Sequence, residues 1–352
     1  MEMGEFVNTS VDDLVNCLSS LKTTNDRNAK EELEKYANDV NFKRRNSSTI
    51  IAMRKFHNWV KRQLIKEVVN YYYTSKKEDI NLLDIAVGRG GDIDKWDEAY
   101  VSAVFGFDPS SESINSIDPF NPGAKTRLSK LDIKVKVHLE IGNALAPSDE
   151  LIRNINTFLI TNKTSAFQIV SCQFAMHYFF KEQLDLQIVL TFVSKYLKKG
   201  GFFIGTTMDS EKIKTLFKGM GNTKIYAKNP LFSIKRDFIA KPTSPYNNKY
   251  IFKINDLVDS GNYFNTMGES TEYLVDFSEL TRVAGTVGLE PVNLNFFETY
   301  TSGSNQVYTN HSHIMPFGEL YDMRKWKPKP KPLSEQEKEL NGLYSTFVFR
   351  KK

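Results

Sequence analysis

The chain has 352 residues, of which 40% are hydrophobic and 25% charged, so it is long and apolar enough to bury a core in one large domain or two. Its net charge of +5 suits an anionic partner without identifying one. With only Cys17 and Cys172, a disulfide or zinc framework is excluded and a reducing, intracellular compartment is indicated. No apolar stretch reaches the roughly 18 residues of a membrane span, and the acidic start of the chain predicts no signal peptide.

Residues 1–45 are polar, and we interpret them as an N-terminal extension of a domain that spans residues 46–352. At residues 48–73 apolar side chains recur with the helical period, which predicts an amphipathic helix. Asn58 and Lys61 lie about a quarter-turn from its apolar stripe. Such polar positions are typical of a solvated face as well as of a binding site.

Residues 80–92 combine a short apolar run, an acid and a turn with three glycines. The run predicts a buried strand that ends at Asp84, and the glycines let the backbone approach a ligand closely. A second strand-like run, residues 101–107, leads into Asp108, where an acid can accept hydrogen bonds from a ribose diol. Two acids and a glycine loop at the ends of neighbouring strands predict a nucleoside site.

The glycine turn differs from two common nucleotide-binding motifs. The sequence contains no Gly-x-x-x-x-Gly-Lys-Ser/Thr, and Ala86 stands where a dinucleotide fingerprint has its first glycine, so a P-loop and an NAD site are disfavoured. A helix expected at residues 92–100 would point its first N–H groups at whatever the glycines enclose. Arg89 and Lys95 flank this point, although Lys95 could equally be a solvated helix residue.

A loop rich in proline and glycine at residues 118–123 interrupts the helix expected after Asp108. Residues 133–139 alternate in polarity and predict a third strand, which leads to Asn143. An amide at such a strand end can both donate and accept hydrogen bonds.

The run at residues 167–173 predicts another strand and ends in four residues with binding potential. Phe174 and Tyr178 offer aromatic surface for a base, and His177 can hydrogen-bond a purine edge. Gln173 precedes them. A single such residue at a strand end is more often structural, so the group as a whole carries the prediction.

The second half predicts a helix at residues 184–197 and a strand at 202–207, followed by a β-rich insert at about 225–277. Glu272 falls in an apolar strand of that insert, where an acid is costly to bury unless it is paired. The N1–H and N2–H₂ groups of guanine would be a natural partner.

Four further segments complete the sequence. We expect a helix at residues 276–287, a strand at 290–299, a polar loop at about 302–340 and a closing strand at 343–350 that carries Tyr344. His311 and His313 form a His-x-His, but no further metal ligands are suitably spaced, so no metal is expected.

Taken together, these motifs resemble those of mRNA cap guanine-N7 methyltransferases. Residues 53–61 follow the family's Leu-Arg-Asn-Phe-Asn-Asn-Trp-Met/Ile-Lys, and residues 82–92 follow Leu-Leu-Asp-Leu-Gly-Cys-Gly-Lys-Gly-Gly-Asp. Residues 167–178 follow Phe-Asp-x-x-Ser-x-Gln-Phe-x-x-His-Tyr, and residues 200–207 and 272–277 match Gly-Gly-Tyr-Phe-Ile-Gly-Thr-Thr and Glu-Tyr-Leu-Val-x-Phe. The chain departs from the family at His57, Ala86, Asn143 and Met208, which suggests a divergent source such as the capping enzyme of a large DNA virus.

The resemblance implies an α/β fold, the class I (Rossmann-like) S-adenosylmethionine-dependent methyltransferase fold, with a mainly parallel sheet and an antiparallel closing strand. It implies methyl transfer from S-adenosyl-L-methionine to N7 of the cap guanine, by alignment without a general base or a metal, which leaves S-adenosyl-L-homocysteine. The implied cofactor-binding residues are Lys61, Asp84, Ala86, Gly88, Asp108, Asn143, Gln173 and Tyr178. The implied cap-binding residues are His57, Asn58, Arg89, Lys95, Phe174, His177, Tyr178, Glu272 and Tyr344.

The implied partner is 5′-capped RNA, with covalently linked triphosphatase and guanylyltransferase domains in a viral enzyme, and no membrane. The protein would act in the host cytoplasm or the virion if viral, and in the nucleus if cellular. Two alternatives stay open at this point. A methyltransferase for another nucleotide or small substrate would bind the cofactor but not cap analogues, and an inactive RNA-binding partner subunit is favoured only by Ala86.

Overall fold

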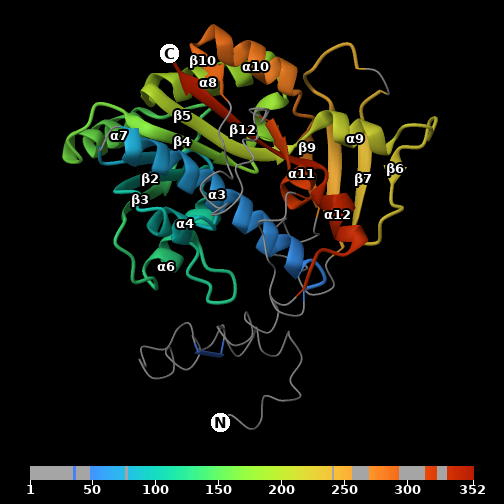
Figure 1. Ribbon diagram of the computed structural model, residues 1–352, viewed down its shortest axis with the longest axis horizontal. Helices are drawn as coiled ribbons and strands as arrows, with labels where there is room; N and C mark the ends of the chain where they lie inside the picture. The colour runs from blue at the N-terminus through green and yellow to red at the C-terminus, as the bar shows by residue number, and fades with distance from the viewer. Residues whose placement is uncertain are drawn as a thin grey trace, which may run out of the picture.

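The structure of the protein is a computed structural model that describes residues 35–36, 48–75, 78–239, 242–255, 269–292, 314–322 and 331–352. Within this part of the chain, an eight-stranded sheet forms the centre of the molecule and a four-stranded sheet stands beside it (Figure 1). Residues 1–34 and 37–47, which form most of the N-terminal extension, and the His-x-His of His311 and His313 lie outside the described residues.

The central sheet has the strand order β10-β12-β5-β4-β1-β2-β3, with β11 paired to β12 outside this path. The pairs from β5 to β3 are parallel, whereas β12 runs antiparallel to β5, which confirms the predicted fold class. Every residue of β4 is buried, as expected for a strand covered on both faces. The strands are β1 (Asn81–Asp84), β2 (Ala103–Asp108), β3 (Lys136–Ile141), β4 (Phe167–Gln173), β5 (Leu197–Met208), β10 (Leu289–Pro291), β11 (Ile314–Pro316) and β12 (Tyr344–Lys351).

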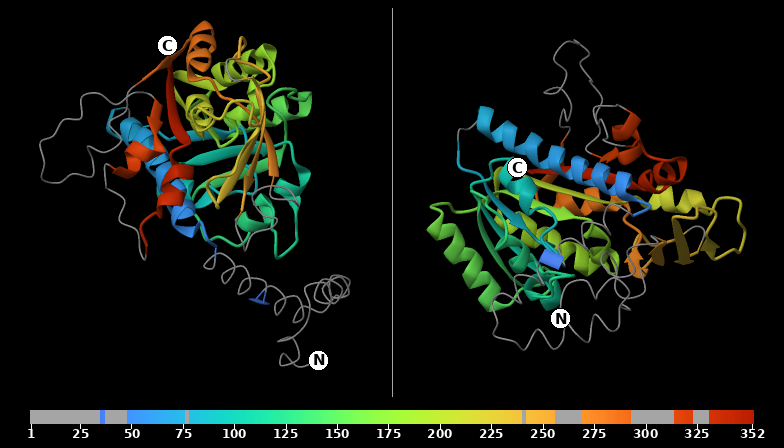
Figure 2. Two further views of the ribbon diagram at one scale, coloured as in Figure 1. Left: turned by 90° about the vertical axis from the view of Figure 1, so that its right-hand side faces the viewer. Right: turned by 90° about the horizontal axis from the view of Figure 1, so that it is seen from below.

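Helices cover both faces of this sheet (Figure 2). Successive strand side chains point to opposite faces, so Leu82 joins a core with α3 and α4, whereas Leu83 joins a second core with α7, α8 and α10. The helices are α3 (Ile51–Ser75), α4 (Ile93–Glu98), α5 (Ser111–Asn115), α6 (Ala124–Leu128), α7 (Asp149–Thr161), α8 (Gln183–Tyr196), α9 (Ser210–Leu216), α10 (Phe277–Thr286), α11 (Phe317–Asp322), α12 (Glu335–Asn341) and the 3₁₀ helix η2 (Met176–Phe180).

The smaller sheet is antiparallel, with the order β6-β7-β8-β9, and occupies the β-rich insert. Its side chains alternate, and the buried ones, such as Phe232 and Phe252, extend the core that contains α3. The strands are β6 (Ile225–Tyr226), β7 (Phe232–Asp237), β8 (Lys249–Ile254) and β9 (Glu269–Tyr273).

The expectation of a polar loop at about 302–340 was wrong for the described part of that segment. It contains β11, α11 and α12, because isolated apolar residues such as Phe317 and Leu340 pack into the core. The Ser334 hydroxyl and the Glu337 carboxylate form a capping box that starts α12. Glu337 also accepts a hydrogen bond from the Met53 N–H at 3.1 Å, which ties α12 to α3.

Candidate active site

A cavity of about 720 Å³ opens at the carboxyl ends of the parallel strands, where α/β sheets bind ligands. Its wall combines α3, the glycine loop after β1, the loops after β2 and β3, the start of η2, and residues of β8, β9 and β12. Thirteen predicted site residues line it: His57, Lys61, Ala86, Gly88, Arg89, Asp108, Asn143, Gln173, Phe174, His177, Tyr178, Glu272 and Tyr344. Three others, Asn58, Asp84 and Lys95, are not part of its wall.

Asp108 joins the end of β2 to the glycine loop. Its Oδ2 accepts a hydrogen bond from the Gly88 N–H at 3.0 Å, and its Oδ1 accepts one from the Ser110 N–H at 2.9 Å. Burial raises the pKa of this carboxyl group, although the two backbone donors oppose the shift. A carboxylate has about four lone-pair positions, so the group can accept further hydrogen bonds from a ligand in the cavity.

The glycine loop leaves room for a ligand at Gly88. This residue has a φ of +53°, in the left-handed region that favours glycine, and a Cβ atom there would meet no atom within 4 Å. Ala86, the departure from the usual glycine, lines the cavity nearby. The loop therefore approaches the open space with its backbone.

Asp84 lies beneath the loop and supports it from within the core. It is 1% exposed, and its Oδ1 accepts a hydrogen bond from the Ala86 N–H at 3.1 Å. Burial, together with the neighbouring charge of Asp92, raises the pKa of Asp84 to about 7. The structure thus places this predicted contact residue behind the cavity wall.

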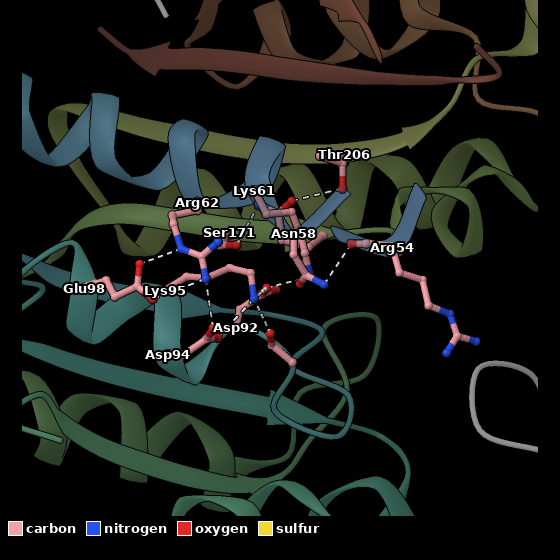
Figure 3. A network of polar contacts seen from close by, with 12 residues as sticks. Arg54, Asn58, Lys61, Arg62, Asp92, Asp94, Lys95, Glu98, Ser171 and Thr206 are labelled. Atoms are coloured by element: carbon pink, nitrogen blue, oxygen red, sulfur yellow. Dashed lines mark hydrogen bonds and ion pairs between the residues drawn. The ribbon is translucent and has the colours of Figure 1, made fainter. Parts of the chain in front are cut away.

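Lys61, Asp92 and Lys95 form a buried ion cluster between α3 and α4 (Figure 3). The Asp92 Oδ1 lies 2.6 Å from the Lys61 Nζ and 3.2 Å from the Lys95 Nζ. Burial alone would raise the pKa of Asp92, but the two ammonium groups outweigh it and lower that pKa. Arg62 extends the cluster to Asp94 and Glu98 of α4 at 3.1 and 2.5 Å. These pairs fix α3 against the glycine loop.

Lys95, one of the implied cap-binding residues, does not line the cavity. Lys95 is only 1% exposed, and its Nζ also donates to the Gly91 carbonyl at 2.5 Å. Asn58 likewise does not reach the cavity, because its Nδ2 donates to the Arg54 carbonyl on the same helix at 2.9 Å. Both side chains support the wall from outside.

An aromatic group forms one side of the cavity. The His57 ring stacks on Phe174, with centroids 5.5 Å apart, and lies 4.7 Å from the Tyr344 ring. Burial and the charge of Lys61 lower the pKa of His57 to about 3, so its imidazole is neutral, and its Nε2 lies 3.2 Å from the Asn341 Oδ1. Phe174 has a φ of +56°, and its N–H donates to the Thr206 carbonyl at 2.8 Å. A non-glycine residue held in this conformation is typical of a functional site.

Glu272 enters the cavity from β9, on the smaller sheet. It is 3% exposed, its Oε2 accepts a hydrogen bond from the Tyr250 hydroxyl at 2.6 Å, and its Oε1 accepts one from the Ser270 hydroxyl at 2.6 Å. The His177 Nδ1 lies 3.9 Å from the same Oε2. Each carboxylate oxygen is therefore held by one protein hydroxyl and retains acceptor capacity for a ligand.

His177 carries an unsatisfied polar atom in the cavity wall. Its Nε2 is buried and has no hydrogen-bond partner among the described residues. Burial lowers the pKa of His177, although the charge of Glu272 opposes the shift. Tyr178 is 53% exposed, with its ring centroid 4.1 Å from that of His177. A buried ring nitrogen without a hydrogen-bond partner is suited to a hydrogen bond with a ligand.

Gln173 and Asn143 have amides that are partly engaged by the protein. The Gln173 Oε1 accepts from the Thr206 hydroxyl at 3.0 Å, and its Nε2 donates to the Ser171 hydroxyl at 3.2 Å. The Asn143 Oδ1 accepts from the Leu145 N–H at 2.9 Å. Asn143 is exposed at the end of β3, so its Nδ2 is accessible to a ligand.

Sequence reasoning missed several wall residues, above all two arginines. Arg54, from α3, and Arg127, from α6, line the cavity together with Arg89. Arg54 and Lys61 are seven residues apart, so the helical period could have placed both on the cavity side. Nothing in the sequence places Arg127 there, because the irregular loop before α6 sets its position. The other wall residues missed include Ser110, Ser113, Thr207 and Ile254.

Metal-ligating side chains do not gather in the described part of the chain, where no group of three or more His, Cys, Asp or Glu is arranged to hold an ion. None of the helices in the described residues is both long and apolar enough to cross a membrane.

Comparison with known proteins gives one family. A model of the mRNA (guanine-N(7))-methyltransferase domain matches residues 20–352. The mRNA cap guanine-N(7) methyltransferase of Schizosaccharomyces pombe is 27% identical over 337 residues, which cover 93% of this chain and 84% of that protein. The Drosophila melanogaster protein of the same name is 28% identical over 260 residues, 73% of this chain and 57% of that protein. The CcbJ methyltransferase of Streptomyces caelestis, a solved structure, is 12% identical with a TM-score of 0.48, and the match covers 82% of this chain and 96% of that one.

Proposed function

The chain belongs to the mRNA (guanine-N(7))-methyltransferase family, and we propose that it transfers the methyl group of S-adenosyl-L-methionine to N7 of the 5′-terminal guanine of capped mRNA. The observation that carries the proposal is that Asp108 of the central sheet and Glu272 of the smaller sheet line one cavity. The first acid suits a ribose diol and the second suits a guanine edge.

The cofactor fits the part of the cavity beside β1 and β2. Gly88 leaves open space in front of its backbone, and Asp108 has acceptor capacity for two hydroxyl groups. Asn143 offers an accessible amide for the adenine. When bound, S-adenosyl-L-methionine would supply an electrophilic methyl group on a sulfonium ion.

The cap guanine fits the part of the cavity beside β9 and β12. Phe174 and Tyr344 supply aromatic surface against which a base can stack. Glu272 accepts hydrogen bonds only, and the Watson–Crick edge of guanine presents two adjacent donors, N1–H and N2–H₂. Adenine presents an acceptor at N1, which would repel the carboxylate instead of donating to it. Arg54, Arg89 and Arg127 provide positive charge for the cap phosphates.

Guanine N7 has a lone pair and no proton, so the chain needs no general base. Its residues act by holding donor and acceptor in one cavity, which removes the entropic cost of a bimolecular encounter. His57 agrees with this role, because an imidazole whose pKa is lowered to about 3 is too weak a base to take up a proton at neutral pH. Two further statements about this protein stay predictions: that it is linked to triphosphatase and guanylyltransferase domains, and that it acts inside the cell.

The test is methyl transfer from labelled cofactor to GpppA-capped RNA, with uncapped RNA as control and product analysis for 7-methylguanosine. Glu272→Gln places an amide donor against the donors of guanine, and we expect a large loss of kcat/KM for cap with near-normal cofactor affinity. Equal methylation of uncapped RNA would refute the substrate. Loss of cofactor binding in Glu272→Gln would refute the role of this residue.

A further inference from the structure

The net positive charge of the chain comes from one segment. Residues 209–255 contain ten Lys or Arg and three Asp or Glu, a net charge of +7, whereas the whole chain carries +5. The other 305 residues therefore carry a net charge of −2. This segment comprises α9 and the strands β6, β7 and β8 of the smaller sheet. A charge so localised produces a directed field that attracts anions.

Most of these basic side chains are on the surface. Five lysines are exposed and form no ion pair with any carboxylate of the described residues: Lys212, Lys218, Lys224, Lys228 and Lys235. Lys249 pairs with Asp237 at 2.9 Å, and the hydrogen bond and charge of this lysine lower the pKa of Asp237. The charges of Lys224 and Lys235 make smaller contributions in the same direction. Three lysines thus surround one acid, which leaves a net positive surface there.

The smaller sheet has two faces with different roles. Tyr250 pairs in register with Glu272, and this face turns toward the cavity. Asp237 pairs in register with Lys249, and by strand alternation Lys235 and Lys253 share that opposite face. The sheet that contributes Glu272 to the cavity therefore carries Lys235, Lys249 and Lys253 on its other face.

From this arrangement we propose that the five exposed lysines around α9 and the smaller sheet, Lys212, Lys218, Lys224, Lys228 and Lys235, bind the phosphate backbone of the RNA chain that follows the cap. The proposal rests on the proposed function, since it concerns the same substrate. The partner is RNA rather than an acidic protein because the proposed substrate carries one phosphate per nucleotide, and because the same sheet contributes Glu272 to the cavity proposed for its cap. Such contacts read no sequence, and they weaken with salt.

The experiment uses the full chain and compares a cap dinucleotide with a capped RNA of about 20 nucleotides, which exceeds typical single-strand sites of about 4–16 nucleotides. We expect the parent to have a lower KM for the longer RNA at low salt, and the triple variant Lys224→Gln, Lys228→Gln, Lys235→Gln to lose that advantage. For single strands the slope of log affinity against log salt is about −0.7 per phosphate contact. Removing three contacts should reduce the slope by about 2, which is roughly 20-fold between 50 and 200 mM salt.

The matched control is Lys134→Gln, Lys136→Gln, Lys199→Gln, which removes three exposed lysines from other surfaces and should keep the length advantage. Unchanged methylation of the cap dinucleotide shows that the triple variant is folded. A parent without a length advantage, or a triple variant that keeps it, would overturn the proposal. Anisotropy with uncapped RNA tests the surface without catalysis: affinity that does not differ between parent and triple variant also overturns it, even where methyl transfer itself fails.

Discussion

Tyr250→Phe should selectively weaken recognition of the cap guanine. Tyr250 is fully buried, and its hydroxyl donates to the Glu272 Oε2 at 2.6 Å, with the Met208 Sδ 3.6 Å away. Phenylalanine keeps the ring and its packing and removes only the hydroxyl group. The carboxylate then loses one of the two hydroxyl donors that orient it.

A hydrogen bond to a charged group contributes about 1.5–3 kcal/mol, which corresponds to about 10- to 150-fold in kcat/KM for capped RNA. Cofactor affinity should stay within about twofold, because Asp108 and Gly88 are unchanged. The parent should also prefer a guanine cap over an inosine cap, since inosine lacks the N2 amino group that pairs with Glu272. In Tyr250→Phe this preference should decrease, because the carboxylate is no longer fixed.

The assay is the ratio of kcat/KM for GpppA- and IpppA-capped RNA in the parent, in Tyr250→Phe and in Ser270→Ala. Ser270→Ala is the matched variant because it removes the other hydroxyl donor to Glu272. A general loss of structure would lower kcat/KM for both substrates by the same factor. The reasoning is refuted by that result, or by kcat/KM for the guanine cap within twofold of the parent.

Four other outcomes follow from the site. Asp108→Ala should weaken cofactor binding by about 1–3 kcal/mol in calorimetry, and unchanged affinity in a folded variant would contradict the role of this acid. Lys95→Met breaks a buried ion cluster, so it should lower the free energy of unfolding by about 3–5 kcal/mol in denaturant and leave the KM for cap unchanged. Arg89→Ala should instead raise the KM for cap with little effect on the free energy of unfolding. The pKa of Asp84 is raised from 3.8 to about 7 in the folded state, so the cofactor-free protein should lose stability as pH rises from about 4 to 7. In thermal unfolding, Asp84→Asn should reduce this dependence of stability on pH. An unchanged dependence would count against the raised pKa.

The sequence predicted the parallel part of the central sheet and thirteen of the residues that line the cavity. Buried parallel strands appear as continuous apolar runs, so β1, β2 and β4 could be predicted within a few residues. Their carboxyl ends meet at one edge of the sheet, which is why Asp108 and Gln173 converge although they are distant in the chain. The first part of β5 was missed because Lys198 and the following glycines look like a turn.

What could not be predicted depends on contacts between distant segments. Lys95 has the spacing of a surface residue, and only the fold shows that Asp92 and the Gly91 carbonyl draw it inward. Asn58 bonds to its own helix, which no residue pattern distinguishes from a ligand contact. The capping box that starts α12 was visible as Ser334 followed by Glu337, but the link of Glu337 to Met53 spans most of the domain.

The charges around the base-binding part of the cavity agree with transfer of a methyl cation. Guanine becomes positively charged as N7 is methylated, so an unpaired cation beside it would oppose the reaction. Lys61, whose Nζ lies 5.4 Å from the centre of the Phe174 ring, is paired with Asp92 at 2.6 Å. His57 is neutral, with its pKa lowered to about 3, and burial lowers the pKa of His177 as well. Glu272 adds a carboxylate to the same wall. Groups fixed in advance around a developing charge stabilise it without reorganisation, so this cavity favours the methylated cation, while the arginines of its wall are suited to the phosphates.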